Sequence, residues 1–152
     1  MGFAKPSLKA RALRLLAQRE HSRAELEAKL ARHVQEGEDL AALLDELQRR
    51  NFINEERVAE SVVHRRAARF GAQRVAQELR RKGLDEDLVR AAAAQLADTE
   101  LERALAVWRQ RFGAAAPAAT PQERARQMRF LAARGFAADV VRQVLRCADE
   151  YE

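Results

Sequence analysis

Apolar positions along the chain recur every three or four residues, which is the spacing of one face of an α-helix. Residues that begin or end helices interrupt this pattern at short intervals. Between the interruptions the pattern predicts helices over nine segments: 8–19, 23–33, 39–50, 55–69, 72–82, 86–97, 99–112, 121–134 and 138–149. The segments fall into three groups of three.

Local signals mark several of these boundaries. Ser22 and Glu25 have the spacing of a capping box, in which each side chain accepts a hydrogen bond from the other residue's backbone amide. Thr120 and Glu123 repeat the motif around Pro121, which favours the first helical position. We expect further N-caps at Asn54, Asp85 and Asp98, and helix ends at Gly71, Gly83 and Gly135.

An internal repeat supports the grouping into threes. Leu79, Gly83, Asp87 and Val89 recur 52 residues later as Leu131, Gly135, Asp139 and Val141. Leu26, Leu30, Asp39 and Leu40 form a weaker first copy that lacks the glycine. The repeat predicts a long helix followed by a helix-turn-helix-like hairpin, whose glycine adopts a left-handed turn. We therefore expect units at 1–50, 51–97 and 98–152, with a flexible loop at 113–121 inside the third unit.

Composition agrees with this reading. Strand formers are scarce, since Val, Ile and Thr number 13 among 152 residues. Leu, Val, Phe and Ile supply only 23% of the chain, which predicts a thin core spread along an elongated body. The expected fold is all-α, with about nine helices in tandem three-helix repeats. No stretch is long and apolar enough to cross a membrane, and no signal peptide is recognisable, so we expect a cytoplasmic protein.

Residues that carry chemistry are few. His21, His33 and His64 lie far apart, with no metal-ligand spacing, and we expect them on helix surfaces. Cys147 follows an apolar stripe, which predicts a buried structural thiol. No nucleophile elbow, phosphate-binding loop or dinucleotide motif occurs. We therefore expect a protein that is not an enzyme and needs neither metal nor cofactor. We also expect it to be a monomer.

Charge is unevenly distributed. The net charge of +5 divides into none for residues 1–48, +4 for residues 49–90 and +1 for residues 91–152. Between 65 and 82 seven cations face Glu78 alone, and these seven are the candidate binding residues: Arg65, Arg66, Arg69, Arg74, Arg80, Arg81 and Lys82. The alternative is a merely solvated face, and Arg66 lies inside an apolar stripe, where it can snorkel. Arg74 and Arg81 share the polar face of their helix, and we expect both to be free to meet a partner.

The positions of the aromatic residues argue against base stacking as a mechanism of nucleic-acid binding. Phe52, Phe70, Phe112, Phe130 and Phe136 stand at helix ends or in apolar stripes, where core anchoring is the first expectation. Binding to single- or double-stranded DNA would then use phosphates, with strong salt dependence and little sequence specificity. Arg outnumbers Lys by 24 to 4, which suits bidentate contacts with phosphate or carboxylate.

Two runs in the basic centre resemble a known family. These are Arg50-Asn-Phe-Ile-Asn-Glu-Glu-Arg57-Val58-Ala59, followed by Arg65-Arg66, and Gln77-Glu-Leu-Arg-Arg-Lys-Gly-Leu84. In combination they resemble the signature of RecX proteins, and the likeness extends over nearly the whole chain. Val58 stands where the family commonly has an aromatic residue, and the Ala/Pro-rich loop of the third unit is a second departure.

The resemblance implies a protein that binds the RecA nucleoprotein filament, lies in its helical groove and restrains ATP hydrolysis, strand exchange and filament growth in DNA recombination and repair. The seven cations would then contact filament DNA and acidic protein surface. A nonspecific helix-turn-helix DNA-binding protein acting without RecA is the alternative. A purely structural helical adaptor is a third reading.

Overall fold

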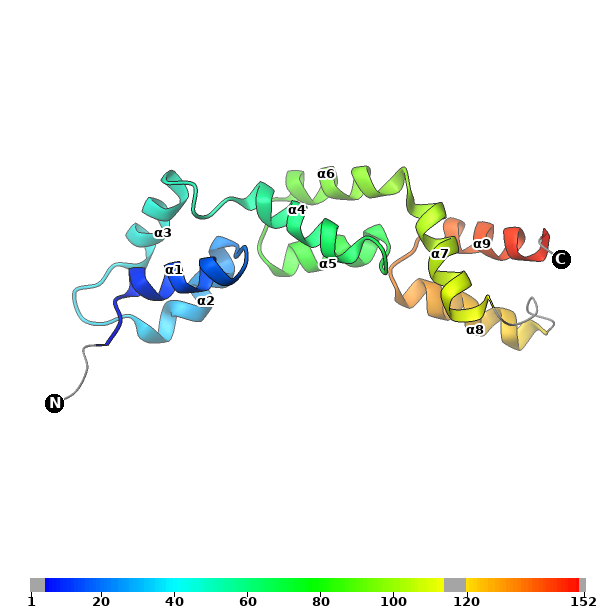
Figure 1. Ribbon diagram of the computed structural model, residues 1–152, viewed down its shortest axis with the longest axis horizontal. Coiled ribbons are helices and arrows are strands. Elements are labelled where there is room, and N and C mark those ends of the chain that lie inside the picture. Colours follow the sequence, from blue (N-terminus) through cyan, green and yellow to red (C-terminus); the bar gives the residue numbers. More distant parts are fainter. Residues whose placement is uncertain (1–4, 114–119, 151–152) are drawn as a thin grey trace.

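The computed structural model describes residues 5–113 and 120–150, and this part of the chain is helical without a β-strand. Its helices are α1 (Leu8–Gln18), α2 (Arg23–Leu30), the 3₁₀ turn η1 (Ala31–His33), α3 (Leu40–Arg49), α4 (Glu55–Arg66), α5 (Ala72–Arg81), α6 (Glu86–Ala97), α7 (Glu100–Phe112), α8 (Pro121–Ala133) and α9 (Ala138–Glu150). All nine predicted helical segments are confirmed. Three small bundles follow one another along the long axis, with α1 and α9 in opposite end bundles (Figure 1).

Most of the predicted helix starts are confirmed by the caps. Ser22 and Glu25 form the complete capping box at the start of α2. Thr120 Oγ1 accepts a hydrogen bond from the Glu123 amide at 3.2 Å, with Pro121 at the first helical position. Asn54 and Asp85 cap α4 and α6. The N-cap predicted at Asp98 is wrong, because Asp98 ends α6 and Thr99 directly precedes α7 without a side-chain cap.

The core is divided among the three bundles. Each bundle buries its own apolar cluster, which agrees with the low content of large apolar residues. Leu26, Leu44 and Leu47 belong to the first cluster, Val62 and Leu79 to the second. The third cluster contains Ala104, Trp108, Leu131, Phe136 and Val144. The unit boundaries 1–50, 51–97 and 98–152 remain our proposal; Ile53 packs with the first cluster.

The repeat of 52 residues has the same backbone geometry in both copies. Gly83 and Gly135 have φ values of 78° and 89°, the left-handed region that favours glycine. The amide of Leu84 donates to Leu79 O at 3.2 Å, and the amide of Phe136 donates to Leu131 O at 3.3 Å. The weaker first copy differs here, because η1 and a longer turn separate α2 from α3. The predicted loop 113–121 lies, except for its ends, outside the described residues.

Second helices of the three units meet end to end. The C-terminal end of α8 meets the start of α5, and the C-terminal end of α5 meets the start of α2, along the lower edge of Figure 1. At the first of these contacts the amide of Gly71 donates to Arg134 O at 2.8 Å. At the second, Ser22 Oγ donates to Lys82 O at 2.6 Å. A donor at one helix start therefore satisfies a free carbonyl at another helix end; the donor is a backbone amide at the first contact and a serine hydroxyl at the second.

Gly71 corrects one prediction. We expected it to close a helix, but it is the N-cap of α5 with φ of −80°, an ordinary conformation. Its small size is what the site requires, because a Cβ atom there would lie 2.3 Å from Gly135 O. Two glycines thus permit the backbones of the second and third units to touch, and this contact helps to fix the elongated shape.

Candidate functional site

The seven predicted cations lie on α4, on the turn that follows it and on α5, but the structure gives them different tasks. Arg80 faces Glu86, with nitrogen to oxygen distances of 2.7 and 3.2 Å. The hydrogen bond to Glu86 raises the pKa of Arg80. Arg80 is therefore occupied within its own unit by an exposed ion pair.

Lys82 belongs to the contact between the first two units. Its Nζ lies 3.2 Å from Glu25 Oε2, and the two side chains are only 16% and 14% exposed. Arg19 binds the same carboxylate oxygen at 2.8 Å. Burial opposes ionisation of Glu25, but hydrogen bonds from Arg19 and Ser22 and the charge of Lys82 lower its pKa to about 2. Lys82 is thus a structural cation whose charge is neutralised.

Arg65 and Arg66 share one carboxylate. Arg66 Nε donates to Glu78 Oε1 at 3.2 Å, while a terminal nitrogen of Arg65 lies 4.0 Å from Glu78 Oε2. Glu78 Oε2 is buried and accepts no hydrogen bond within the described residues. One acidic group therefore compensates two arginines, and positive charge is left over on the edge of α4.

We expected Arg74 to be free to meet a partner, but in the structure its side chain binds the third unit. Its Nη1 donates to Ala133 O at 2.8 Å, at the end of α8. Its guanidinium also lies 4.8 Å from the centre of the Phe70 ring. Only Arg69 and Arg81 among the seven have side chains without a hydrogen bond or ion pair to any described residue.

Phe70 organises the arginines at the junction of the second and third units. Besides Arg74, the guanidinium groups of Arg66 and Arg134 lie 5.6 and 5.4 Å from its ring centre. Arg134 reaches across to a second ring, Phe130, at 5.0 Å. Such cation–π contacts hold a guanidinium by its face and leave its edge N–H groups free to donate. We call Arg66, Phe70, Arg74, Arg111, Phe130 and Arg134 the arginine–phenylalanine cluster.

Two hollows adjoin this cluster. A cleft of about 120 Å³ is lined by Arg66, Phe70, Arg74, Val75, Glu78 and Arg81. A second of about 220 Å³ is lined by Arg69, Val107, Gln110, Arg111, Phe130 and Arg134. Each contains at least three cations, and only Glu78 opposes them. Both can therefore receive anionic oxygens, which planar guanidinium groups bind in pairs.

Arg103 of α7 holds the turn that carries Arg69 and Phe70. Its guanidinium donates to Ala67 O at 2.8 Å, to Phe70 O at 2.7 Å and to Leu96 O at 2.9 Å. Burial lowers the pKa of Arg103, yet a guanidinium stays charged at neutral pH. The position of Phe70 is in this way fixed from the first helix of the third unit.

Sequence reasoning missed Arg111 and Arg134. The signal was present for Arg134, which stands 52 residues after Lys82 and so occupies the same place in the repeat. No comparable signal existed for Arg111, which reaches Phe130 at 5.6 Å only because α7 packs on α8. The basic stretch was therefore predicted to end at 82, although the cationic surface continues onto the third unit.

Comparison with known proteins identifies the family. The chain matches family models of RecX for the second three-helix domain, over residues 54–92, and for the third, over residues 98–145. Regulatory protein RecX of Leptothrix cholodnii is 57% identical over 94% of this chain and 90% of its own length. The RecX protein of Herminiimonas arsenicoxydans is 51% identical over 96% and 95%. The chain belongs to the RecX family of regulatory proteins.

Crystal structures of two more distant RecX proteins have the same fold. The structure from Lactobacillus salivarius matches with a TM-score of 0.78 at 19% identity, over 94% of this chain and 95% of that one. A second RecX structure matches with a TM-score of 0.68 at 23% identity, over 90% and 70%. These likenesses confirm the all-α class. Val58, which we expected to be a departure from the RecX pattern, is buried in the second core.

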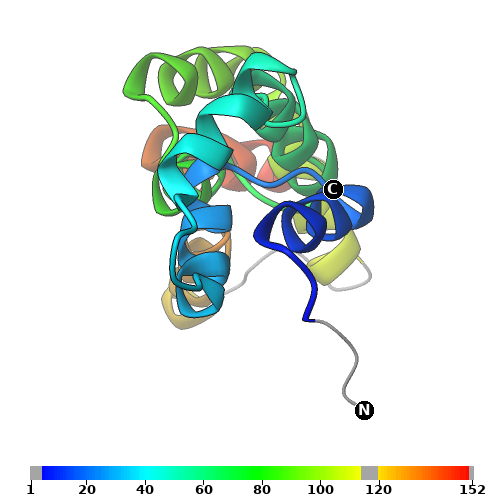
Figure 2. The same ribbon diagram turned by 90° about the vertical axis from the view of Figure 1, so that its left-hand side faces the viewer.

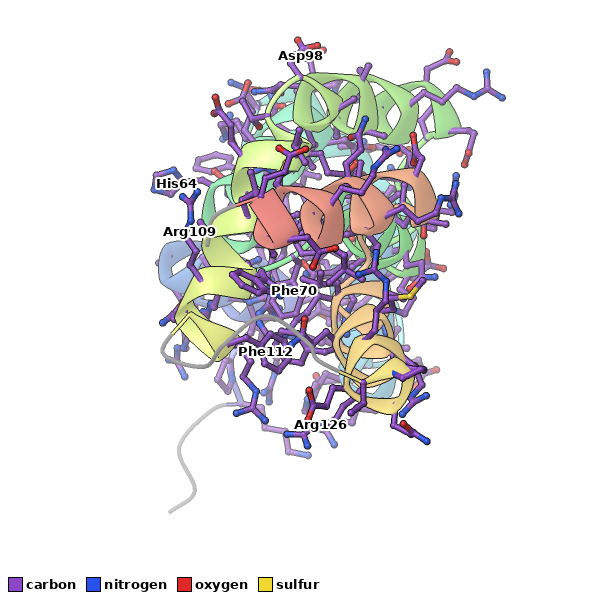
Figure 3. All side chains as sticks on the ribbon, turned by 90° about the vertical axis from the view of Figure 1, so that its right-hand side faces the viewer. His64, Phe70, Asp98, Arg109, Phe112 and Arg126 are labelled. Atoms are coloured by element: carbon purple, nitrogen blue, oxygen red, sulfur yellow. The ribbon has the colours of Figure 1, made fainter. Side chains whose placement is uncertain are left out.

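The phenylalanines in the described part of the chain lie in three kinds of environment. Phe136 is buried, and Phe112 and Phe130 pack against the third core, as predicted. Phe52 is 45% exposed, so core anchoring was wrong there. In the view from the end that carries the third unit, Phe70 and Phe112 lie inside the outline, whereas Asp98 and Arg126 lie at its edge (Figure 3). Phe70 is half-buried beneath arginines rather than in a core.

Residues expected to carry no chemistry also need correction in detail. His21 is not a surface residue, being only 1% exposed, and Cys147 is half-buried rather than fully buried. In the residues that the structure describes, no three His, Cys, Asp or Glu side chains gather where they could hold a metal ion. No helix within 5–113 or 120–150 combines the length and apolar character of a membrane span.

Proposed function

We propose that this protein is a monomeric cytoplasmic regulator that binds the RecA nucleoprotein filament and restrains its ATP hydrolysis and recombinase activity. Membership of the RecX family supports a regulatory role. Of the seven cations predicted between 65 and 82, Arg80 and Lys82 are held by carboxylates. The proposed contacts are made by the other five, Arg65, Arg66, Arg69, Arg74 and Arg81, together with Arg111 and Arg134. Its ligands are phosphates of single- and double-stranded DNA and acidic groups of the filament, without sequence specificity.

The observation that carries this proposal is the surplus of guanidinium groups at the junction of the second and third units. Arg66, Arg74 and Arg134 are oriented by one ring, Phe70, and Glu78 is the single carboxylate of the two adjoining hollows. Holding like charges together costs free energy unless an anion binds between them. An elongated body with such a surface near its middle suits a long polyanionic partner (Figure 1).

The experiment is inhibition of the DNA-dependent ATPase of RecA by the full-length protein and its variants. Reversing all seven cations would also break contacts that hold the fold, such as those of Lys82 and Arg74. Arg69→Glu with Arg81→Glu avoids this problem, because neither side chain is paired within the described residues. We expect the concentration for half-inhibition to rise roughly tenfold or more, as expected for the loss of two charge-assisted contacts.

A matched control changes the net charge equally but elsewhere. Arg49→Glu with Arg142→Glu reverses two exposed arginines on α3 and α9, and inhibition should stay close to that of the original protein. Unchanged inhibition by the Arg69/Arg81 variant would refute the assignment. Equal affinity for naked duplex and for RecA filaments would instead favour the nonspecific DNA-binding alternative.

A further inference from the structure

A third cationic hollow lies in the first unit, in the end bundle farthest from α9 (Figure 1). It measures about 550 Å³ and lies between α1 and the C-terminal end of α2 with η1. The view from that end shows α1 and α2, in blue and light blue, in front of the rest of the body (Figure 2). Its polar lining is Arg11, Arg14, Lys29, Arg32 and His33, and none of the described lining residues is acidic.

The helical spacing explains how these side chains converge. Arg11 and Arg14 are three residues apart on α1 and so share one face of that helix. Lys29 and Arg32 are likewise three apart, at the end of α2 and in η1. Leu15 and Leu30 provide the apolar part of the lining between them. Two helices thus direct four permanent cations and one imidazole toward the same space.

Charges in this hollow are not neutralised by their hydrogen-bond partners. Lys29 Nζ bonds to His21 Nε2 at 3.1 Å, and Arg32 Nε donates to His33 Nε2 at 3.2 Å. Both acceptors are imidazoles, and these contacts require them to be uncharged. Burial lowers the pKa of His21, and desolvation together with the charges of Arg11, Arg32 and Lys5 lowers the pKa of His33. Arg11 and Arg14 have no ion pair with any described residue.

Acidic residues of the first unit are engaged elsewhere, which is why its net charge of zero concealed the hollow. Glu25 binds Arg19 and Lys82, and Glu20 binds Arg57 across the junction to the second unit. Two more acidic residues, Asp45 and Glu46, lie on α3. Asp45 pairs with Arg23, and Glu46 pairs with Lys9 and Arg50. The charges of this unit are therefore segregated rather than mixed.

The end of a helix explains only part of this arrangement. Cations in the last turn of α2 and in η1 are favoured by the negative end of the helix dipole, which accounts for Lys29, Arg32 and His33. It does not account for Arg11 and Arg14, which project from the middle of α1. Those two bring additional positive charge to a place that is already cationic. A bound anion removes the resulting repulsion.

We propose that this hollow binds the phosphodiester backbone of a single nucleic-acid strand, independently of the site at the junction of the second and third units. Arginine forks bind phosphate oxygens in pairs, and successive phosphates of one strand match cations spread along two helices. The lining contains no aromatic residue on which a base could stack, so the contact is to backbone and is insensitive to sequence. An acidic protein segment is the competing occupant.

The test measures binding of a fluorescently labelled oligodeoxythymidylate to the full chain, without RecA, by anisotropy over a series of salt concentrations. Arg11→Glu with Arg14→Glu should weaken binding roughly tenfold or more. The slope of log affinity against log salt should fall by about 1.4, since each lost contact with a single strand contributes about 0.7. Arg11→Gln with Arg14→Gln should reduce the slope equally, because it removes the same contacts without adding repulsion.

The controls separate this site from general electrostatics and from the function proposed above. Arg49→Glu with Arg142→Glu has the same net charge and should keep the slope; an equal loss there overturns the proposal. Polyglutamate of matching charge should compete poorly, and equal competition would assign the hollow to acidic proteins instead. Helical circular dichroism checks that each variant folds. The compared variants all keep the junction site intact, so a difference between them reports on this hollow whether or not that site regulates the filament.

Discussion

At the junction of the first and second units the end of α5 meets the start of α2, and at the next junction the end of α8 meets the start of α5. Lys82 and Arg134 occupy equivalent places in these two contacts, 52 residues apart. Lys82 binds Glu25 in a nearly enclosed ion pair. Arg134 instead lies between the rings of Phe70 and Phe130. The same end-to-end arrangement of helices is thus combined with two kinds of side-chain chemistry.

The difference separates structural cations from available ones. A carboxylate that accepts hydrogen bonds from a lysine cancels its charge and occupies its donors. An aromatic face stabilises a guanidinium mainly through the ring and leaves the charge and the edge donors accessible. At the first junction the charge of Lys82 is therefore neutralised by Glu25, whereas at the second junction the charge of Arg134 is not neutralised. Our functional proposal rests on this contrast rather than on the number of basic residues.

The largest effect we expect comes from adding one methyl group at the second junction. In Gly135→Ala the new Cβ would lie 2.6 Å from the backbone nitrogen of Arg74, at a residue whose φ is 89°. The backbone clash and the left-handed strain together should lower the free energy of unfolding by about 3 kcal/mol. Urea denaturation followed by circular dichroism measures it.

The matched substitution at the first junction should cost less. In Gly83→Ala the new Cβ meets only the Cβ of Ala24, at 2.7 Å, so the loss should be about 1–2 kcal/mol, mostly backbone strain. Adding Ala24→Gly removes this contact, so the loss that remains from Gly83→Ala should be the backbone strain. Equal losses for Gly135→Ala and Gly83→Ala would mean that the two junctions are packed alike.

The second prediction tests whether the first junction depends on charge. The pKa of Glu25 is about 2 in the fold against an ordinary value near 4.5, so the folded state binds fewer protons than the unfolded state. Its contribution, about 2 kcal/mol, is present above pH 5 and is lost as pH falls through about 2. Glu25→Gln should therefore destabilise the protein at pH 7 and have little effect near pH 2.

Glu27→Gln provides the control for this pH dependence. Glu27 is an exposed carboxyl on the same helix, and its substitution should change stability little at either pH. Unfolding free energies at pH 7 and at low pH decide the matter. A Glu25→Gln variant with the same deficit at both pH values would show that shape, not charge, makes Glu25 important.

Helices and caps were predictable because their causes are local. Ser22 needs only Glu25 three residues later, and the glycines at 83 and 135 end helices by their own conformation. The N-cap predicted at Asp98 was wrong although it too rested on a local signal, because the choice between Asp98 and Thr99 depends on how α6 and α7 pack. Gly71 was recognised as special for the wrong reason. Its partner, the carbonyl of Gly135, is 64 residues away.

The binding surface was predictable only in part. The excess of charge between 65 and 82 is visible in the sequence, but the partner of each cation is set by tertiary contact. Lys82 meets a carboxylate 57 residues earlier, and Arg74 meets a carbonyl 59 residues later. Net charge also concealed the hollow of the first unit, because a sum over 48 residues discards their arrangement. Charge position, rather than charge count, carried the missing information.

The smallest effect we predict concerns the ring that distinguishes the second junction. Phe70→Leu keeps an apolar side chain but removes the face on which Arg66, Arg74 and Arg134 rest. We expect a loss of about 1 kcal/mol in unfolding free energy, and little dependence of that loss on salt. Phe52→Leu is the control, because Phe52 is exposed and no described arginine lies over its ring. Equal losses for the two variants would mean that Phe70 acts as an apolar filler, and the junction arginines would then owe their orientation to carbonyls such as that of Ala133.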